Sequence, residues 1–314
     1  MRRGWIAQAA LVAALALALG WLWQNAAHNL ETRKIASGFA FLWREAGFEI
    51  GETGGLAYSA ADSYLRALAI GLANTFRVAA IGIVLATVLG ALLGLARLAP
   101  NWLLAKLAAA YVEFVRNVPL VVQLFFWYAL ISENLPGPRE AHEPLPGVYL
   151  SNRGIFFPLP GSRPELVGFN FAGGASLSPE FAALLAGLVT YTAAFIAEIV
   201  RAGILSVRRG QLDAARSLGM THRQALRHVV LPQALRAIVP PMTSQYLNLV
   251  KNSSLAVAIG YPDLVSIANT TINQTGQAIE GIAIIMAVYL TVSLAISAFM
   301  NWYNRRVALK GLRA

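Results

Sequence analysis

Long apolar stretches separated by polar segments dominate the pattern of the chain. Six of them carry few or no charged residues, and they cover positions 5–23, 78–96, 117–132, 181–197, 237–250 and 281–304. Because a helix needs roughly 20 apolar residues to cross a bilayer, the first, second and sixth stretches are long enough to span. The other three are shorter, so we expect polar residues near their ends to face protein or water and to line a path. The pattern predicts an all-α integral membrane protein with about six transmembrane helices.

The composition of the chain agrees with a place in the membrane. Of its 314 residues, 57% are hydrophobic and 13% are charged, and the mean hydropathy is +0.57. Soluble domains carry about 25% charged residues, so this chain has too little polar surface for water. It contains no cysteine, which excludes disulfides, thiolate metal ligands and a cysteine nucleophile.

The distribution of charge predicts the orientation. With six spans and the N-terminus inside, the cytoplasmic segments hold 16 of the 25 basic and 3 of the 15 acidic residues. That side carries +13 and the remainder −3, as the positive-inside rule requires. Both termini are therefore expected in the cytoplasm. The net charge of +10 needs no nucleic acid, because anionic lipid and a cytoplasmic partner can both attract it.

Residues 1–63 form the first segment, with an N-terminal span followed by external sequence. The span is either a cleaved signal peptide or an anchor; its length and the interfacial residues Trp21 and Trp23 favour the anchor. Charge bias does not distinguish the two, because removing one span leaves the others in the same orientation. Residues 39–48 form either an amphipathic interfacial helix or an ordered loop packed on neighbouring helices.

An insertion at residues 133–178 is the longest polar segment. Its prolines exclude a long helix and lie at positions 136, 138, 144, 146, 158, 160 and 164. Placed outside, it is either a docking surface for an extracytoplasmic partner or a passive insertion. Ser178 and Pro179 are typical of the N-cap and first residue of the following helix.

The basic segment at residues 205–239 predicts two short helices. Gly219 occupies the position where a left-handed C-cap favours glycine, and Thr221 with Gln224 forms a capping box. We expect Pro232 to break the second helix and the pair at 240–241 to open the next span. In the second apolar stretch, Gly90 and Gly94 are spaced for close helix approach.

The same basic segment resembles the cytoplasmic "EAA" loop of permease subunits of bacterial ABC importers. The matching residues are Asp213, Ala214, Ala215, Gly219, Leu231 and Pro232. Residues 111–125, 191–203 and 251–255 resemble further segments of the family for polar and general L-amino acids, including histidine and glutamine permeases. The resemblance covers roughly residues 64–302. The chain departs at Asp213, where the family usually has Glu, and at Val229, where it usually has Ile.

This resemblance implies a type I ABC importer core plus one extra N-terminal helix. Residues 64–304 would be the permease domain, with the coupling loop at 207–232 and a cytoplasmic tail at 305–314. The family assembles two permease subunits, identical or homologous, with two cytoplasmic ATPase subunits and a periplasmic amino-acid-binding protein. ATP and Mg would be bound by the ATPase, so no cofactor is expected in this chain. The expected location is the bacterial inner membrane.

Six polar residues in the shorter stretches are candidates for the substrate path. A zwitterionic ligand needs donors for its carboxylate and acceptors for its ammonium, and interhelical hydrogen bonds would use the same side chains. The six are Gln123, Tyr191, Thr192, Asn248, Asn252 and Ser253.

Charged residues supply a second set of candidates. Glu198 and Arg201 lie three apart on one helix face and form either a structural ion pair or a gate, and Glu113 with Arg116 repeats the spacing. Lys251 is a lone cation that faces water, protein or ligand or snorkels to the surface. Asp213 is either part of the coupling loop or an ordinary first-turn acid. The six arginines around it fit a lipid-facing basic surface as well.

Several motifs are absent from the sequence. No lysine follows a glycine, so the chain lacks the Gly-Lys of a P-loop, and there is no His-Glu-x-x-His or Gly-x-Ser-x-Gly. The four histidines are scattered without metal-ligand spacing. We therefore expect no catalytic site and no metal. The alternative function is an ion-gradient-driven secondary transporter, which would need internal repeats or carboxylates at the midplane.

Overall fold

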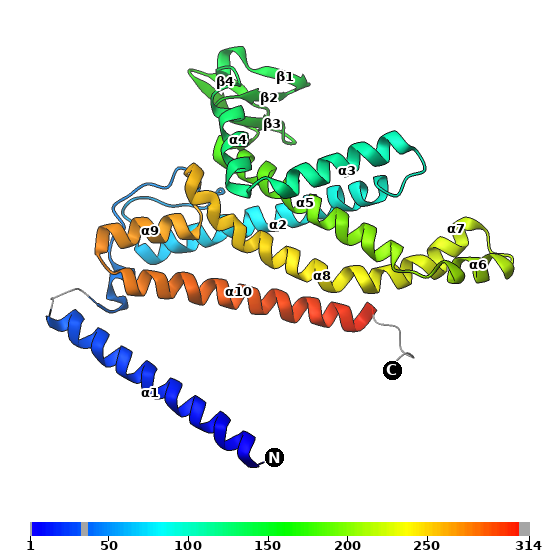
Figure 1. Ribbon diagram of the computed structural model, residues 1–314. Coiled ribbons are helices and arrows are strands. Elements are labelled where there is room, and N and C mark those ends of the chain that lie inside the picture. The colour runs from blue at the N-terminus through cyan, green and yellow to red at the C-terminus, as the bar shows by residue number, and fades with distance from the viewer. Residues whose placement is uncertain (1, 33–36, 308–314) are drawn as a thin grey trace.

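A computed structural model describes residues 2–32 and 37–307 (Figure 1). The long helices are α1 (Arg2–Thr32), α2 (Tyr64–Ala96), α3 (Trp102–Asn117), α4 (Leu120–Ser132), α5 (Pro179–Leu205), α8 (Leu231–Asn252), α9 (Leu264–Thr275) and α10 (Ala278–Val307). Two short helices, α6 (Arg209–Ser217) and α7 (His222–Ala225), lie between α5 and α8. Shorter 3-10 or π-helical segments are η1 (Phe39–Trp43), η2 (Pro138–Glu140), η3 (Leu226–Val230) and η4 (Ser253–Ile259).

Four of these helices are long and apolar enough to cross a membrane: α1, α2, α5 and α10. Two further spans are possible as bent pairs, α3 with α4 at 106° and the helical segment His222–Ile259 with α9 at 52°. Up to six spans result, in agreement with the sequence. In α1 the candidate span is Gln8–Ala26, and the helix lies apart from the bundle of α2, α5, α8 and α10 (Figure 1).

The helices extend beyond the apolar stretches. Charged residues that flank these stretches lie within the helices, where some of them form ion pairs. Helix α2 begins at Tyr64, so Arg77 lies inside it instead of flanking it, and Arg77 forms an ion pair with Glu52 at 2.6 Å. Helix α5 likewise continues past Ala197 to Leu205. The predicted tail at 305–314 belongs to α10 as far as Val307, and positions 308–314 lie outside the described residues.

The two proline predictions on the entry to α8 were wrong. Pro232 does not break a helix, because α7 continues through one π-helical turn, η3, directly into α8. Pro240 and Pro241 lie inside α8 instead of opening it. A proline in a membrane helix is tolerated where neighbouring groups or a local π adjustment satisfy the freed carbonyls. At Pro232 that adjustment is η3, which widens the turn where the proline lacks an N–H.

Helices α2 and α5 pack closely through the two glycines that the sequence marks. A Cβ on Gly90 would lie 2.6 Å from the Cβ of Ile196, and one on Gly94 would lie 2.8 Å from the Ala197 carbonyl. Both distances are impossible for real side chains, so the small-residue spacing is confirmed as a contact surface.

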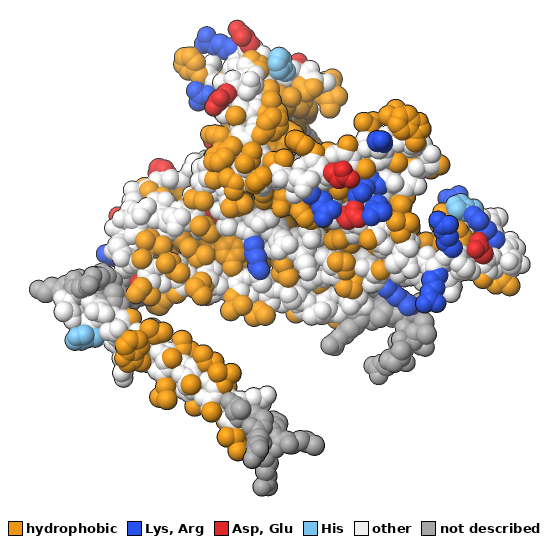
Figure 2. Space-filling model, viewed as in Figure 1, with side chains coloured by type: hydrophobic (Ala, Val, Ile, Leu, Met, Phe, Trp, Pro, Cys, Tyr) orange, Lys and Arg blue, Asp and Glu red, His pale blue; other side chains and the backbone are white. Residues whose placement is uncertain are grey.

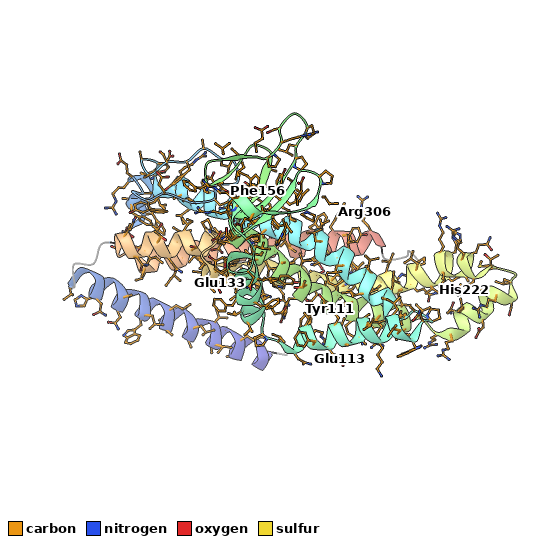
Figure 3. The ribbon with its side chains drawn as sticks, turned by 90° about the horizontal axis from the view of Figure 1, so that it is seen from above. Tyr111, Glu113, Glu133, Phe156, His222 and Arg306 are labelled. Atoms are coloured by element: carbon orange, nitrogen blue, oxygen red, sulfur yellow. The ribbon has the colours of Figure 1, made fainter. Side chains whose placement is uncertain are left out.

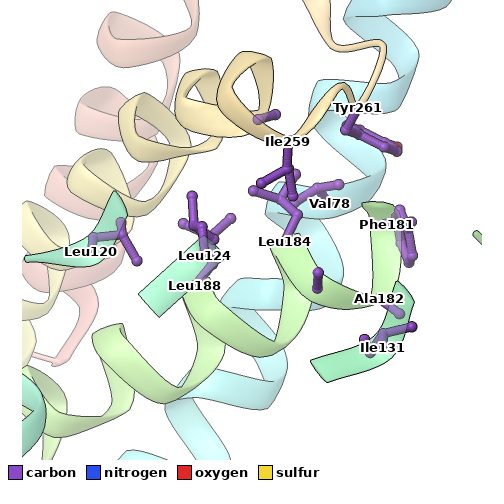
Figure 4. Packing of buried hydrophobic residues seen from close by; sticks show 12 residues of the cluster. Val78, Leu120, Leu124, Ile131, Phe181, Ala182, Leu184, Leu188, Ile259 and Tyr261 are labelled. Atoms are coloured by element: carbon purple, nitrogen blue, oxygen red, sulfur yellow. The ribbon is translucent and has the colours of Figure 1, made fainter. Parts of the chain in front are cut away.

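The core lies where α2, α4, α5 and η4 meet (Figure 4). Val78 of α2, Leu124 of α4 and Leu184 of α5 are fully buried there. The ring of Tyr261 after η4 packs beside Phe181 with 5.7 Å between centroids. Four segments far apart in sequence are therefore held as one unit.

The insertion at 133–178 contains a β-subdomain, which we define as residues 142–177. Its strands are β1 (His142–Leu145), β2 (Val148–Ser151), β3 (Gly154–Phe157), β4 (Glu165–Val167), β5 (Asn170–Ala172) and β6 (Ala175–Leu177). They form an antiparallel sheet in the order β1-β2-β3-β6 and a separate pair, β4-β5. The insertion contains no long helix, as expected. Its short strands are an addition to the all-α fold that the sequence predicted. Ser178 caps α5 by accepting a hydrogen bond from the Phe181 N–H at 3.0 Å.

The described segment before α2, residues 37–63, is an ordered loop, and the alternative of an amphipathic helix over 39–48 was wrong. Only the five-residue turn η1 is helical, with Phe41 buried against Tyr64 at 6.0 Å between ring centroids. The preceding Gly38 is held by α10 and the residue before it: its N–H donates to Glu280 at 2.6 Å and its carbonyl accepts from Gln277 at 2.9 Å. The loop is thus fixed to the bundle at both ends.

Candidate coupling and translocation site

The predicted coupling loop folds as a helical hairpin, which we call the coupling hairpin and define as residues 209–230. Helix α6 ends in a Schellman motif: the Gly219 N–H donates to the Arg216 carbonyl and the Met220 N–H to the Ala215 carbonyl. Gly219 has φ +80, the left-handed conformation that favours glycine. The Thr221 hydroxyl and the Gln224 side chain then form the reciprocal capping box that starts α7.

Two alanines let the arms of the hairpin touch. Ala215 on α6 and Ala225 at the end of α7 are 4% and 0% exposed. Asp213, Ala214 and Gly219 face solvent. The hairpin therefore buries Ala215 and Ala225 between its arms and leaves Asp213, Ala214 and Gly219 on its surface.

The position assigned to Asp213 needs a correction. Helix α6 begins at Arg209 and has no acid in its first turn, so Asp213 lies one turn further in. The helix dipole acts within the first turn, and it therefore gives this carboxylate little stabilisation. The basic side chains of the hairpin form a cluster at one end of the molecule (Figure 2), with Arg208, Arg209, Arg216, Arg223 and Arg227 all exposed.

Leu231 and Pro232 lie at the junction of η3 and α8. Leu231 is 50% exposed and lines two apolar grooves, of about 500 and 510 Å³, on the helices that carry the hairpin. Because the helical path from α7 to α8 is uninterrupted, a force on the hairpin acts directly on a membrane helix. This continuity is the mechanical property that a coupling element needs.

An ion triad lies close to the hairpin. The Glu198 carboxylate on α5 accepts a hydrogen bond from Arg201 at 2.6 Å, so the ion pair predicted from sequence is present. A second guanidinium, from Arg97 at the end of α2, also contacts Glu198. Sequence reasoning missed Arg97 because it lies 101 positions away; its place just after an apolar stretch was the available signal. The triad joins the ends of α2 and α5.

The second predicted pair, Glu113 with Arg116, is not formed. Both side chains are exposed on α3, and the guanidinium of Arg116 lies over the ring of Phe195, 5.0 Å from its centroid. In Figure 3 Glu113 lies on the outer side of α3, while Tyr111 lies toward α5. The Tyr111 hydroxyl donates to the Thr190 carbonyl at 3.1 Å. This spacing therefore produces a contact between helices instead of an ion pair.

Two of the six path candidates form side-chain hydrogen bonds to backbone carbonyls. Gln123 donates through Nε2 to the Val115 and Val118 carbonyls at 2.9 and 3.0 Å, which closes the corner between α3 and α4. Ser253 is fully buried and donates to the Val250 carbonyl at 2.7 Å. Both side chains form interhelical or local hydrogen bonds. This is the alternative to a substrate-binding role that the sequence left open.

The other four candidates lie on α5 and α8. Thr192 is 3% exposed on α5, and the ring of its neighbour Tyr191 packs at a tilt against Phe195 with 5.0 Å between ring centroids. Asn248 and Asn252 lie four residues apart on α8, the first exposed and the second half-buried. Lys251 is exposed in the last turn of α8. Their role in a substrate path remains a prediction.

We find no candidate metal-binding site among the residues that the structure describes. No group of three or more His, Asp or Glu side chains is placed to hold an ion there.

Comparison with known proteins gives one family. Residues 86–309 match the sequence model described as "Binding-protein-dependent transport system inner membrane component". This range is more than half of the chain. It includes the coupling hairpin, the ion triad, and all helices from the middle of α2 to α10.

Relatives extend the similarity over almost the whole chain. "Putative amino-acid ABC transporter permease protein YhdX" of Escherichia coli (strain K12) is 46% identical over 98% of this chain and 94% of its own length. "General L-amino acid transport system permease protein AapQ" of Rhizobium johnstonii is 41% identical over 92% of this chain and 88% of its own. The solved structure titled "Crystal structure of an amino acid ABC transporter with histidines" contains a chain 27% identical, with a TM-score of 0.59, covering 77% of this chain and 95% of that one.

Proposed function

Because the chain belongs to the family of binding-protein-dependent transport system inner membrane components, we propose that it is the membrane-spanning permease subunit of an ABC importer for L-amino acids. Both relatives above carry amino-acid permease names. The observation that carries the mechanism is the exposed coupling hairpin with its continuous helical connection to α8. An ion-gradient-driven transporter has no use for such an element.

The energy source would lie in other subunits. Since the sequence has no Gly-Lys of a P-loop, ATP and Mg would be bound by two cytoplasmic ATPase subunits that receive the coupling hairpin. A second permease, identical or homologous, would complete the membrane unit. A periplasmic amino-acid-binding protein would deliver the substrate from the outer side.

The orientation follows from charge. We place both termini and the coupling hairpin in the cytoplasm, where five exposed arginines of the hairpin and its N-cap fit the positive-inside rule. The β-subdomain is then outside and offers the surface on which the binding protein docks. Reporter fusions should place residue 155 outside and residue 215 inside; finding both on one side would overturn this topology.

The transport cycle would be one of alternating access. Closure of the ATPase dimer moves the coupling hairpin, and α8 transmits the movement to the bundle. Nucleotide can shift this equilibrium only by its different affinity for the two states. The triad of Arg97, Glu198 and Arg201 is our candidate for the contact that re-pairs as the inner end opens.

The test is uptake in reconstituted vesicles. The chain is purified with its ATPase and second permease, and uptake of a radiolabelled L-amino acid is measured with and without ATP and binding protein. We expect uptake that requires both. Uptake that follows an imposed proton or sodium gradient and ignores ATP would favour the secondary transporter instead.

A further inference from the structure

A polar cavity of about 350 Å³ lies outside the coupling hairpin and the predicted substrate path. Three parts of the chain line this open cavity: the glycine-rich loop at residues 51–55, the β-subdomain, and two helix positions, Arg77 on α2 and the α5 N-cap Ser178. Phe156, which is 4% exposed, forms part of its wall, and Figure 3 shows this residue on the sheet above the helices. The cavity is large enough for one small molecule.

A fixed ion pair lines the cavity. Glu52 accepts a hydrogen bond from Arg77 at 2.6 Å, its other carboxylate oxygen accepts one from the Ser178 hydroxyl, and its carbonyl accepts one from Asn74 at 2.7 Å. The face of the Arg77 guanidinium lies 4.5 Å from the centre of the Phe181 ring. Cation and anion are thus held side by side in one orientation before any ligand arrives.

The glycine loop keeps this pair accessible. Gly54 and Gly55 adopt φ +64 and +86, which glycine tolerates and other residues rarely adopt. A Cβ on Gly54 would lie 3.5 Å from the Arg77 Nη1. A side chain at Gly54 would therefore be strained by the backbone and would pack directly against the Arg77 guanidinium.

A second guanidinium lines the same cavity from the β-subdomain. Arg153 lies in the turn between β2 and β3, is exposed, and makes no ion pair among the described residues. Two guanidinium groups and one carboxylate therefore line the cavity, which leaves one positive charge without a partner. A guanidinium binds a carboxylate through two parallel hydrogen bonds.

We propose that this cavity binds a free L-amino acid through its zwitterionic backbone. The α-carboxylate lies between Arg153 and Arg77, and the α-ammonium lies against Glu52. The two charges of an amino acid are separated by one carbon atom, so they can align antiparallel to the adjacent Arg77–Glu52 pair. Because every L-amino acid carries these two groups, the site binds L-amino acids as a class and does not discriminate between their side chains.

This inference rests on the proposed function, which makes amino acids the transported class. In that setting the site is an entrance stage on the outer side, between release from the binding protein and the path through the bundle. The test uses the whole transporter in lipid nanodiscs without binding protein. Binding of L-alanine is titrated by saturation-transfer NMR, beside its methyl ester, which lacks the carboxylate, and N-acetyl-L-alanine, which lacks the ammonium.

We expect L-alanine to bind wild type at least about tenfold more tightly than either derivative, and Arg153→Gln to lose about tenfold in affinity. Arg153→Lys should retain part of the binding. Arg163→Gln is the matched control, since Arg163 belongs to the same subdomain and does not line the cavity; it should bind as wild type does. Arg153 is exposed, so none of these variants should disturb folding.

Equal alanine binding in Arg153→Gln and wild type overturns the site. The site is also overturned if Arg153→Gln binds alanine normally but needs more liganded binding protein for half-maximal ATPase stimulation. In that case Arg153 would bind a carboxylate side chain of the docked binding protein. If wild-type vesicles still take up amino acids with ATP and binding protein, either result rejects the site and leaves the proposed importer function supported. The absence of uptake dependent on ATP and binding protein in wild type would count against the importer itself.

Discussion

The coupling hairpin and the β-subdomain both protrude from the helical bundle but are held in different ways. The hairpin is stabilised by backbone capping at Gly219 and Thr221 and buries little beyond two alanines. The β-subdomain has a small core of its own, in which Phe171 stacks on Tyr149 with 4.5 Å between ring centroids and packs at a tilt against Phe156 with 4.9 Å.

Their connections to the membrane helices differ too. The hairpin runs into α8 without interruption, whereas the β-subdomain meets α5 at an N-cap, Ser178. A continuous helix transmits displacement, while a capped joint allows the two sides to move separately. The comparison teaches that the hairpin is suited to transmitting force and the β-subdomain to presenting a surface.

The largest effect is expected from Gly219→Val. Valine at φ +80 costs about 1–3 kcal/mol and adds bulk to the surface that we propose contacts the ATPase, so uptake should fall to background while the protein still inserts. Gly147→Val is the control, because Gly147 has the same conformation, φ +78, in the turn of β1 and β2. That variant should keep most uptake; equal loss in both would remove the distinction between the two regions.

A companion substitution on the same surface is Asp213→Lys. It reverses the single acidic charge of the coupling hairpin on an exposed position, and we expect ATPase stimulation by the binding protein to be lost with it. Since the dipole has little effect on this residue, the loss would report contact with the partner rather than helix stability. Unchanged stimulation would assign Asp213 to the ordinary solvated surface.

An intermediate effect is expected at the ion triad. Glu198→Gln leaves Arg97 and Arg201 without their shared partner, and for partly exposed groups this costs about 1–2 kcal/mol. Basal ATPase activity should rise and uptake should fall several-fold. Glu113→Gln is the control, since Glu113 is exposed and forms no ion pair among the described residues. In the Arg97→Gln background the effect of Glu198→Gln should shrink; full additivity would contradict a working triad.

A smaller effect is expected in the β-subdomain. Phe171→Ala removes the aromatic stack and should destabilise the subdomain by about 2 kcal/mol, seen as faster proteolysis within residues 142–177. Uptake should fall only at low concentrations of binding protein, because docking and not coupling is weakened. Phe169→Ala, at a position 76% exposed, serves as the control. A loss of ATP-driven uptake at saturating binding protein would assign coupling to this region too.

The smallest effect is expected from Thr221→Ala, which removes the capping box of α7 at a cost of about 1 kcal/mol. Uptake should fall by about half, and Thr221→Ser should restore it. A serine variant as poor as alanine would mean that the methyl group, and not the cap, matters at this position.

The contrast between local capping in the coupling hairpin and packing in the β-subdomain also explains which features could be predicted from the sequence. Gly219 and Thr221 act on their own backbone neighbourhood, so local rules located both caps, and Gly90 with Gly94 acted through a spacing that is visible in the sequence. The strands of the β-subdomain are three or four residues long, too short for an alternating pattern to emerge among prolines.

Long-range packing decided the remaining features. Arg97 and Glu198 meet across 101 residues, and no local rule pairs them. Pro240 and Pro241 remain within α8, although the local rule places a proline in the first turn of a helix. Gln123 was expected in the path, but its reach to two carbonyls at the corner of α3 and α4 depends on a bend of 106°.

The central claim is that the coupling hairpin is seated in the ATPase, and cysteine crosslinking tests it most directly. The natural chain has no cysteine, so a single introduced thiol reports one position. Leu218→Cys lies beside Gly219 at a site 80% exposed, and Leu145→Cys lies on β1 at a site 64% exposed. We predict that the first crosslinks to the ATPase, with a yield that changes on ATP binding, and that the second does not. Crosslinking from Leu145→Cys, or none from Leu218→Cys in a complex active for uptake, would contradict the account.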